Sequence, residues 1–98
     1  MRLIDIRSID RQRMEILILI YGVANGSKRQ RARMVEIKTL TQIEATQYVD
    51  IIDFWVDENC ITRKFEAAEN EEYSLTHSGI LKVEESLRAQ LTPRIKSL

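Results

Sequence analysis

The residues best suited to chemistry in this chain lie in one short basic segment. Lys28, Arg29, Arg31 and Arg33 place four cations within six residues, more than solubility alone requires. Residues 1–33 carry eight cations against three acids, a net charge of +5, whereas residues 49–72 carry two cations against eight acids, a net charge of −6. A chain with its charge separated in this way can bind an anion with its basic part, or pair that part with the acidic part of a second copy. Surface charge placed only for solvation is the simpler alternative.

No pattern of residues typical of an enzyme is present in the sequence. It has no glycine-rich phosphate loop, no nucleophile elbow and no His-Glu-x-x-His motif. Its one histidine, His77, has no second histidine, cysteine or carboxylate at a metal-ligand spacing. We therefore predict no catalytic residue, no metal site and no cofactor. The one cysteine, Cys60, cannot form an internal disulfide, so we expect a small buried hydrophobic residue there, with an intermolecular redox contact as the alternative.

The length of 98 residues predicts a single domain over residues 1–98. Hydrophobic residues make up 44% and charged residues 31% of the sequence, as in globular proteins with a packed core. The longest apolar run, residues 16–21, has six residues, whereas a membrane-spanning helix needs about 20. The amino end also lacks an apolar stretch followed by a small-residue cleavage site. We therefore expect a cytoplasmic protein with no membrane partner.

Apolar spacing predicts two helices that flank a turn at Asn25 and Gly26. Asp10 can cap the first helix, which is apolar on nearly all sides and is therefore expected at the centre of the fold, although its β-branched residues also suit a strand. Ser27 and Gln30 have the spacing of a capping box, which predicts a second helix over about residues 28–38. The basic segment then occupies the first turns of this helix. Cations at a helix start are unfavourable with the helix dipole, and an anionic partner compensates for this.

A third helix is predicted from the capping-box spacing of Thr41 and Glu44, and it ends near residues 58–59. Ile51 and Phe54 lie off its main apolar stripe, so this helix has either a second buried side or an exposed apolar strip. The main stripe consists of Ala45, Tyr48, Val49, Ile52, Trp55 and Val56.

The pattern then changes to a hairpin followed by a last helix. Residues 60–66 and 72–76 are predicted strands joined by a tip at 67–71. Thr76 can cap the last helix, and Pro93 is expected to end it. One face of this helix carries Ile80, Val83, Leu87 and Leu91. The predicted fold class is α+β and mostly helical.

The order of these elements resembles a winged-helix domain over roughly residues 9–91. The hairpin end, Tyr73-Ser-Leu-Thr-His-Ser-Gly79, matches the pattern Tyr-x-Leu-Thr-x-x-Gly that opens the last helix in many prokaryotic winged-helix regulators. Residues 45–61 are most similar to small archaeal winged-helix proteins that dimerise through the carboxyl-terminal helix and bind double-stranded DNA. The resemblance implies a winged helix-turn-helix with a three-helix core, a two-stranded β-hairpin wing and a carboxyl-terminal helix. The core then covers about residues 9–76 and the last helix about 77–91.

The resemblance also implies a function, that of a transcriptional regulator that binds double-stranded DNA as a homodimer. In a winged helix the amino end of the third helix enters the major groove and the start of the second lies by a phosphate. The residues that this geometry assigns to base edges are Thr41, Gln42, Thr46 and Gln47, and those that it assigns to phosphates are Lys28, Arg29, Arg31 and Arg33. The implied dimer contacts are Ile80, Val83, Leu87 and Leu91, with the Ile51 and Phe54 strip as an addition.

The predicted wing departs from the usual basic pattern. Its cations, Arg63 and Lys64, are the DNA contacts that the resemblance implies for the wing, but they are adjacent, so in a strand they point to opposite faces. Carboxylates stand in and around the wing at Glu66, Glu69, Glu71 and Glu72, and the third helix carries Asp50, Asp53 and Asp57 on one side. Because carboxylates repel phosphate, a winged-helix module that docks a protein and does not bind DNA is the alternative function.

Overall fold

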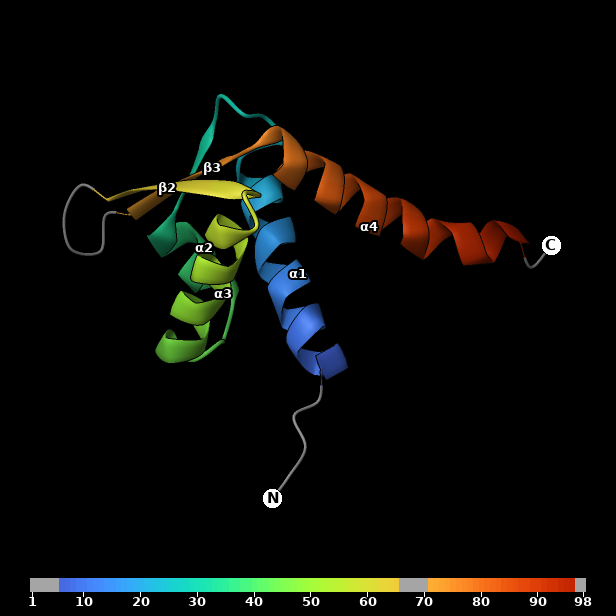
Figure 1. The fold of residues 1–98 in the computed structure, drawn as a ribbon, viewed down its shortest axis with the longest axis horizontal. Helices are drawn as coiled ribbons and strands as arrows, with labels where there is room; N and C mark the ends of the chain where they lie inside the picture. The colour runs from blue at the N-terminus through green and yellow to red at the C-terminus, as the bar shows by residue number, and fades with distance from the viewer. Residues whose placement is uncertain (1–5, 66–70, 97–98) are drawn as a thin grey trace, which may run out of the picture.

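The described residues form four helices and one antiparallel sheet of three short strands, an α+β arrangement (Figure 1). The computed structural model describes residues 6–65 and 71–96, with side chains as far as Leu91. Among these residues no helix is both long enough and apolar enough to span a bilayer. In chain order the elements are α1 (Ile6–Val23), β1 (Arg31–Arg33), α2 (Met34–Leu40), α3 (Ala45–Asp57), β2 (Ile61–Phe65), β3 (Glu71–Leu75) and α4 (His77–Lys96).

The sheet has the order β1-β3-β2, and its two faces differ in character. Ala32 pairs with Tyr73, and Ile61 pairs with Leu75; all four are buried. This inner face lies against α1, α2 and α3, which lie together below the sheet in Figure 1. Because side chains alternate along a strand, the inner face also carries Arg63, Phe65 and Glu71. The outer face carries Arg31, Arg33, Thr62, Lys64, Glu72 and Ser74.

Helix α1 is central, as its all-round apolar pattern predicts. Ile16, Leu17 and Ile20 are fully buried, and the helix packs against α2, α3, α4 and two of the strands. The predicted start at Asp10 is wrong, since α1 begins at Ile6 and Asp10 lies within it. The predicted end is confirmed: Asn25 and Gly26 both adopt the left-handed backbone, with φ of 54° and 65°.

The predicted helix over 28–38 is wrong in its first half. Residues 28–30 form a turn, Arg31–Arg33 is strand β1, and α2 begins only at Met34. The Ser27 hydroxyl accepts a hydrogen bond from the Arg29 backbone N–H at 3.1 Å, which closes a turn and caps no helix. The cap of α2 comes instead from the Glu36 carboxylate, which accepts a hydrogen bond from the Arg33 backbone N–H at 3.2 Å.

Helix α3 also begins later than predicted. Thr41 adopts an extended backbone at the end of α2, Gln42 lies in the loop, and Glu44 is the N-cap with no side-chain cap. The predicted capping box of Thr41 and Glu44 is therefore absent. Ile51 is 6% exposed, so α3 has a second buried side, and Ile51 is not available for dimer contact.

The hairpin is confirmed to within one residue at each end. Its tip lies outside the described residues, and so do Glu66 and Glu69. Cys60, just before β2, is 4% exposed and belongs to the core, as expected, and burial raises the pKa of its thiol.

Helix α4 begins with the predicted cap. The Thr76 hydroxyl accepts a hydrogen bond from the Gly79 backbone N–H at 3.0 Å and donates one to the Asn59 carbonyl at 2.6 Å. Pro93 does not end this helix, which continues to Lys96. The four predicted dimer residues divide along it. Val83 is fully buried in the core of its own chain and Ile80 packs against that core, whereas Leu87 is 39% and Leu91 58% exposed, where α4 leaves the body of the molecule (Figure 1).

Candidate nucleic-acid interface

The predicted contact residues lie on two different faces of the molecule. Thr46 and Gln47 are exposed in the first turn of α3, within the helical layer. Arg31 and Arg33 flank the buried Ala32 in β1, so they lie on the face of the sheet opposite the core. The predicted single surface, made from the basic segment and the start of α3, is therefore not formed. The cause is that the basic segment is a turn and a strand, not a helix.

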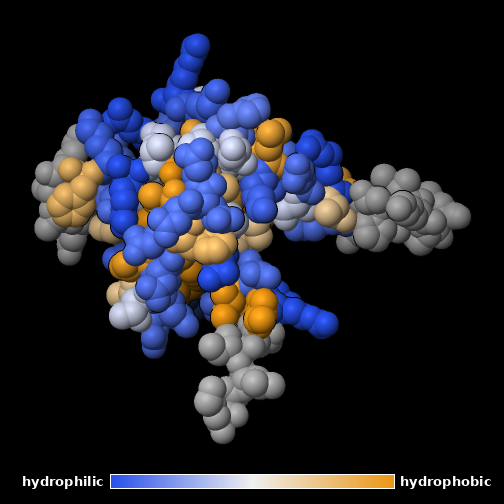
Figure 2. All heavy atoms as spheres, in the orientation of Figure 1, coloured by the Kyte–Doolittle hydropathy of each residue, from blue (hydrophilic) through white to orange (hydrophobic). Residues whose placement is uncertain are grey.

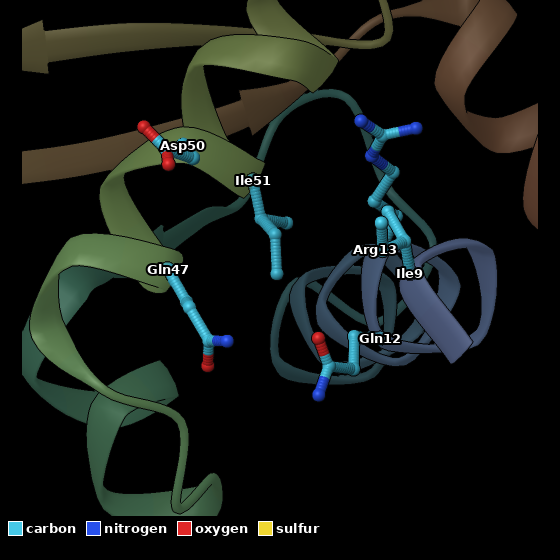
Figure 3. Close-up of a pocket in the computed structure, with 6 residues that line it drawn as sticks. All are labelled: Ile9, Gln12, Arg13, Gln47, Asp50 and Ile51. Atoms are coloured by element: carbon cyan, nitrogen blue, oxygen red, sulfur yellow. The ribbon is translucent and has the colours of Figure 1, made fainter. Parts of the chain in front are cut away.

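An open groove of about 230 Å³ runs between α1 and α3. Figure 3 shows that the carboxamides of Gln12 and Gln47 extend toward the same opening, whereas Asp50 points away from it. Within the described residues neither carboxamide is hydrogen-bonded. Each therefore offers a donor and an acceptor, the groups that recognise the edge of a base. The residues that line the groove are Ile9, Gln12, Arg13, Gln47, Asp50 and Ile51.

Gln12 is a candidate that the sequence analysis missed. The sequence predicts a central core helix that begins near Asp10, and this prediction includes no surface role for its first turns. The available signal was the polar sequence Asp-Arg-Gln-Arg at residues 10–13, which interrupts the apolar pattern. Four extra residues at the start of α1 extend these polar turns beside α3.

Arg13 of α1 makes two contacts with α3 at one side of this groove. Its guanidinium lies 3.9 Å from the centre of the Phe54 ring, and its backbone carbonyl accepts a hydrogen bond from the Trp55 indole N–H at 2.7 Å. Trp55 and Tyr48 are 3% and 2% exposed. These aromatic residues are core residues, as predicted, and they are not platforms for stacking a base.

Arg63, predicted as a DNA contact, is held by two carboxylates of its own chain. Its guanidinium donates to Glu71 at 3.0 and 3.3 Å and to Asp53 at 2.7 Å. Arg63 pairs with Tyr73 in the sheet and therefore lies on the inner face, whereas Lys64 lies on the outer face. The predicted opposition of the two side chains is confirmed, and it places Arg63 and Lys64 on different faces of the sheet.

Glu71 joins this ion pair to two buried tyrosines. It is 7% exposed, and its carboxylate accepts a hydrogen bond from the Tyr73 hydroxyl at 2.8 Å. The Tyr48 and Tyr73 hydroxyls lie 2.7 Å apart. Since Tyr73 donates its one hydrogen to Glu71, Tyr48 donates to Tyr73. A continuous chain of hydrogen bonds thus links α3, through Tyr48 and Asp53, to the hairpin; we call it the tyrosine–carboxylate network.

The pH dependence of stability follows from this network. Burial raises the pKa of Tyr48 to about 12 and also raises that of Tyr73. The unfolded chain releases these protons near pH 10, whereas the folded chain retains them. The stabilisation is complete below pH 10 and is lost as the pH rises toward 12, by about 1.4 kcal/mol per pH unit for each tyrosine.

The free energy of unfolding is expected to fall less steeply with pH in Tyr48→Phe than in the wild type, because one of the two titrating hydroxyls is gone. Urea unfolding of both proteins at pH 9, 10 and 11 measures the slope. Equal slopes for the variant and the wild type contradict the assignment.

The outer face of the sheet carries cations around one carboxylate. The register places Arg33, Glu72 and Lys64 in one row across the strands, and Arg31, Ser74 and Thr62 in the next. Arg31 lies 3.7 Å from Glu72, and Arg33 lies 3.4 Å from Glu36. Lys28 and Arg29 are exposed in the turn just before β1. Figure 2 shows hydrophilic residues projecting above the sheet in this region.

The exposed side of α3 is acidic beyond its first turn. Asp50 and Asp57 are exposed, and Asp53 is half-buried against Arg63. The acidic stripe predicted from their spacing is therefore present, with one of its charges neutralised. Within residues 6–65 and 71–96, no group of His, Cys, Asp and Glu is arranged to hold a metal ion. No family model, curated protein or solved structure matches this chain.

Proposed function

We propose that this chain is a winged-helix protein that binds double-stranded DNA through the first turns of α3 and α1 and acts as a regulator of transcription. The observation that carries the proposal is the pair of unbonded carboxamides, Gln12 and Gln47, at one open groove beside the exposed Thr46. A Gln carboxamide can bond adenine in a bidentate manner, and the Thr methyl can contact the thymine methyl.

The order of elements supports the winged-helix assignment. Helix α3 directly precedes the β2–β3 hairpin, and β1 completes the sheet on the other side of β3. In winged-helix proteins the helix in this position is the one that reads the major groove. The proposal includes a homodimer through the exposed part of α4, where Leu87 and Leu91 are exposed. Light scattering of the pure protein measures its molar mass and so tests the dimer.

Fluorescence anisotropy with a labelled duplex tests DNA binding. We expect binding at about 50 mM salt and a loss of roughly 100-fold in affinity at about 200 mM, because release of counterions from about four phosphates gives this dependence. Failure to bind any duplex at the lower salt concentration removes the proposal.

Base reading has a separate expected result. After selection of a preferred duplex, we expect Thr46→Ala with Gln47→Ala to reduce the preference for it over a scrambled duplex by about tenfold, since a bidentate contact discriminates by about 1–3 kcal/mol. The matched control is Gln90→Ala, which removes an exposed glutamine from α4. An unchanged preference in the double variant contradicts base reading by α3.

Docking of a basic protein is the second candidate, and the acidic side of α3 favours it. Asp50 and Asp57 are exposed, and carboxylates there attract a cationic partner and repel phosphate. Replacing both by Asn separates the two functions. If α3 reads DNA, the variant binds duplex DNA more tightly than the wild type, because two repulsive charges are gone. If α3 docks a basic protein, neither the variant nor the wild type binds duplex DNA.

A further inference from the structure

We infer that the outer face of the sheet is a second, sequence-independent contact for the DNA backbone, so that one molecule holds two duplex segments. This inference rests on the proposed function, because it takes the α3 side as the first DNA contact. It explains why the cations and the base-reading side chains, expected to act together, lie on opposite sides of the sheet.

The outer face has a composition suited to phosphate. Arg31, Arg33 and Lys64 supply cationic donors in two adjacent strand rows, and Thr62 and Ser74 add hydroxyl donors directly opposite each other. Arg, Lys, Ser and Thr are the side chains that contact phosphate oxygens in protein–DNA complexes. Antiparallel sheets often have one face open to solvent, and in the described part of the chain no helix covers this one.

The balance of charge on this side is positive. Arg31, Arg33 and Lys64, with Lys28 and Arg29 in the adjoining turn, make five cations. In the described part of the chain, Arg31 is paired with Glu72 and Arg33 with Glu36, and Lys64 also has an interaction partner. The two pairs are long, at 3.4 and 3.7 Å, and both arginines are exposed, whereas Glu72 is partly buried. Long pairs with an exposed arginine contribute little, so the arginines can exchange a carboxylate for a phosphate when DNA binds.

The same face favours duplex backbone over single-stranded nucleic acid. Proteins that bind single strands stack bases on aromatic side chains. The aromatic residues of the described strands, Phe65 and Tyr73, both belong to the inner face by their register with Glu71 and Arg63. Cations and hydroxyls without a stacking platform contact the phosphate backbone and carry no sequence information.

A single straight duplex cannot reach both contacts. The helices α1, α2 and α3 lie on the inner side of the sheet, and Thr46 and Gln47 belong to that layer. The cations of the outer face point the opposite way. Because DNA is stiff over about 150 base pairs, short duplexes on the two faces are separate molecules, whereas distant parts of one long DNA can occupy both.

A two-duplex capture assay tests the inference. A biotinylated duplex of about 30 base pairs is held on beads, wild-type protein is added at about 50 mM salt, and a fluorescent second duplex is then supplied. We expect the wild type to retain the second duplex. We expect Arg31→Ala with Arg33→Ala to reduce this retention at least tenfold while its own binding to the immobilised duplex changes less than threefold. The matched control, Lys82→Ala with Arg88→Ala, removes two exposed cations from α4 and retains the second duplex.

The remaining outcomes separate the two proposals. If the protein does not bind the immobilised duplex, the proposed function fails. If it binds that duplex but never captures a second one, only the inference fails. Capture that persists in the double arginine variant also overturns the inference, because two α3 surfaces of a dimer are then sufficient. Loss of all binding in that variant makes the outer face the sole DNA contact and overturns the two-face arrangement.

Discussion

Gly79→Ala is expected to lower the free energy of unfolding by about 3 kcal/mol, a large part of the stability of a small domain. A Cβ at this position overlaps the carbonyl oxygen of Cys60 and lies 2.9 Å from its carbonyl carbon. The obstacle is backbone, and it is held in place because the Thr76 backbone N–H donates to that same oxygen at 3.0 Å. Urea denaturation of the variant and the wild type measures the loss.

Gly22→Ala is the matched control for this prediction. Gly22 also lies in a helix, α1, but a Cβ there meets nothing within 4 Å. Alanine has the higher helix propensity, so this variant is expected to be more stable than the wild type by about 0.5–1 kcal/mol. A loss of stability of similar size in both variants shows that the contact with Cys60 is not the cause.

The close approach at Gly79 also explains the last residue of the Tyr-x-Leu-Thr-x-x-Gly pattern. Thr76 caps α4 through the Gly79 N–H, and this cap brings the first turn of α4 against the chain that enters β2. Only glycine leaves room for the Cys60 carbonyl there. The threonine and the glycine of the pattern thus serve one junction between the hairpin and the last helix.

Glu71→Ala is expected to cost about 3 kcal/mol, because it breaks a partly buried ion pair and leaves the buried Tyr73 hydroxyl without its acceptor. The variant removes the acceptor of the Tyr73 hydroxyl and both contacts from Glu71 to Arg63. Glu71→Gln keeps one carbonyl oxygen as an acceptor, so its loss is expected to be smaller. Urea denaturation at pH 7 measures the free energy of unfolding of the wild type, Glu71→Ala and Glu71→Gln.

Glu72→Ala is the control for Glu71→Ala. Glu72 lies next to Glu71 in β3 but on the outer face, where its pair with the exposed Arg31 is long, at 3.7 Å. Such pairs contribute at most about 1 kcal/mol. Equal losses at the two positions contradict the importance of the tyrosine–carboxylate network. Because this network joins α3 to the hairpin, hydrogen exchange in Glu71→Ala is expected to rise in β2 and β3 before it rises in α1.

Long periodic elements could be predicted from the sequence because the signal for them is local. The all-round apolar run of α1 placed it at the centre, and the change to alternating residues located β2 and β3. The Thr76 cap was visible because a capping hydroxyl acts only three residues away. Helix starts were less well predicted: α1 begins four residues before Asp10, and α3 begins after Glu44 with no side-chain cap.

Site residues were harder to predict because their environment comes from distant parts of the chain. Arg63 was predicted as a DNA contact from its charge, but Asp53 and Glu71 engage it from α3 and β3. Gln12 and Gln47 stand 35 residues apart in the sequence and meet only because α1 packs beside α3.

The sequence alone determined the composition of the basic segment, the apolar faces of the long helices and the hairpin. Only the tertiary structure decided that the basic segment is a strand. Residues 28–38 are rich in Arg, Lys, Gln, Met and Glu, which favour a helix, but the edge of β3, some 40 residues later, offers backbone hydrogen bonds to Arg31–Arg33. Burial of Ala32 against the core adds to that pairing and outweighs the small local preference. The physical reason is that helix propensity is set within a few residues, whereas a strand needs a partner that the local sequence does not contain.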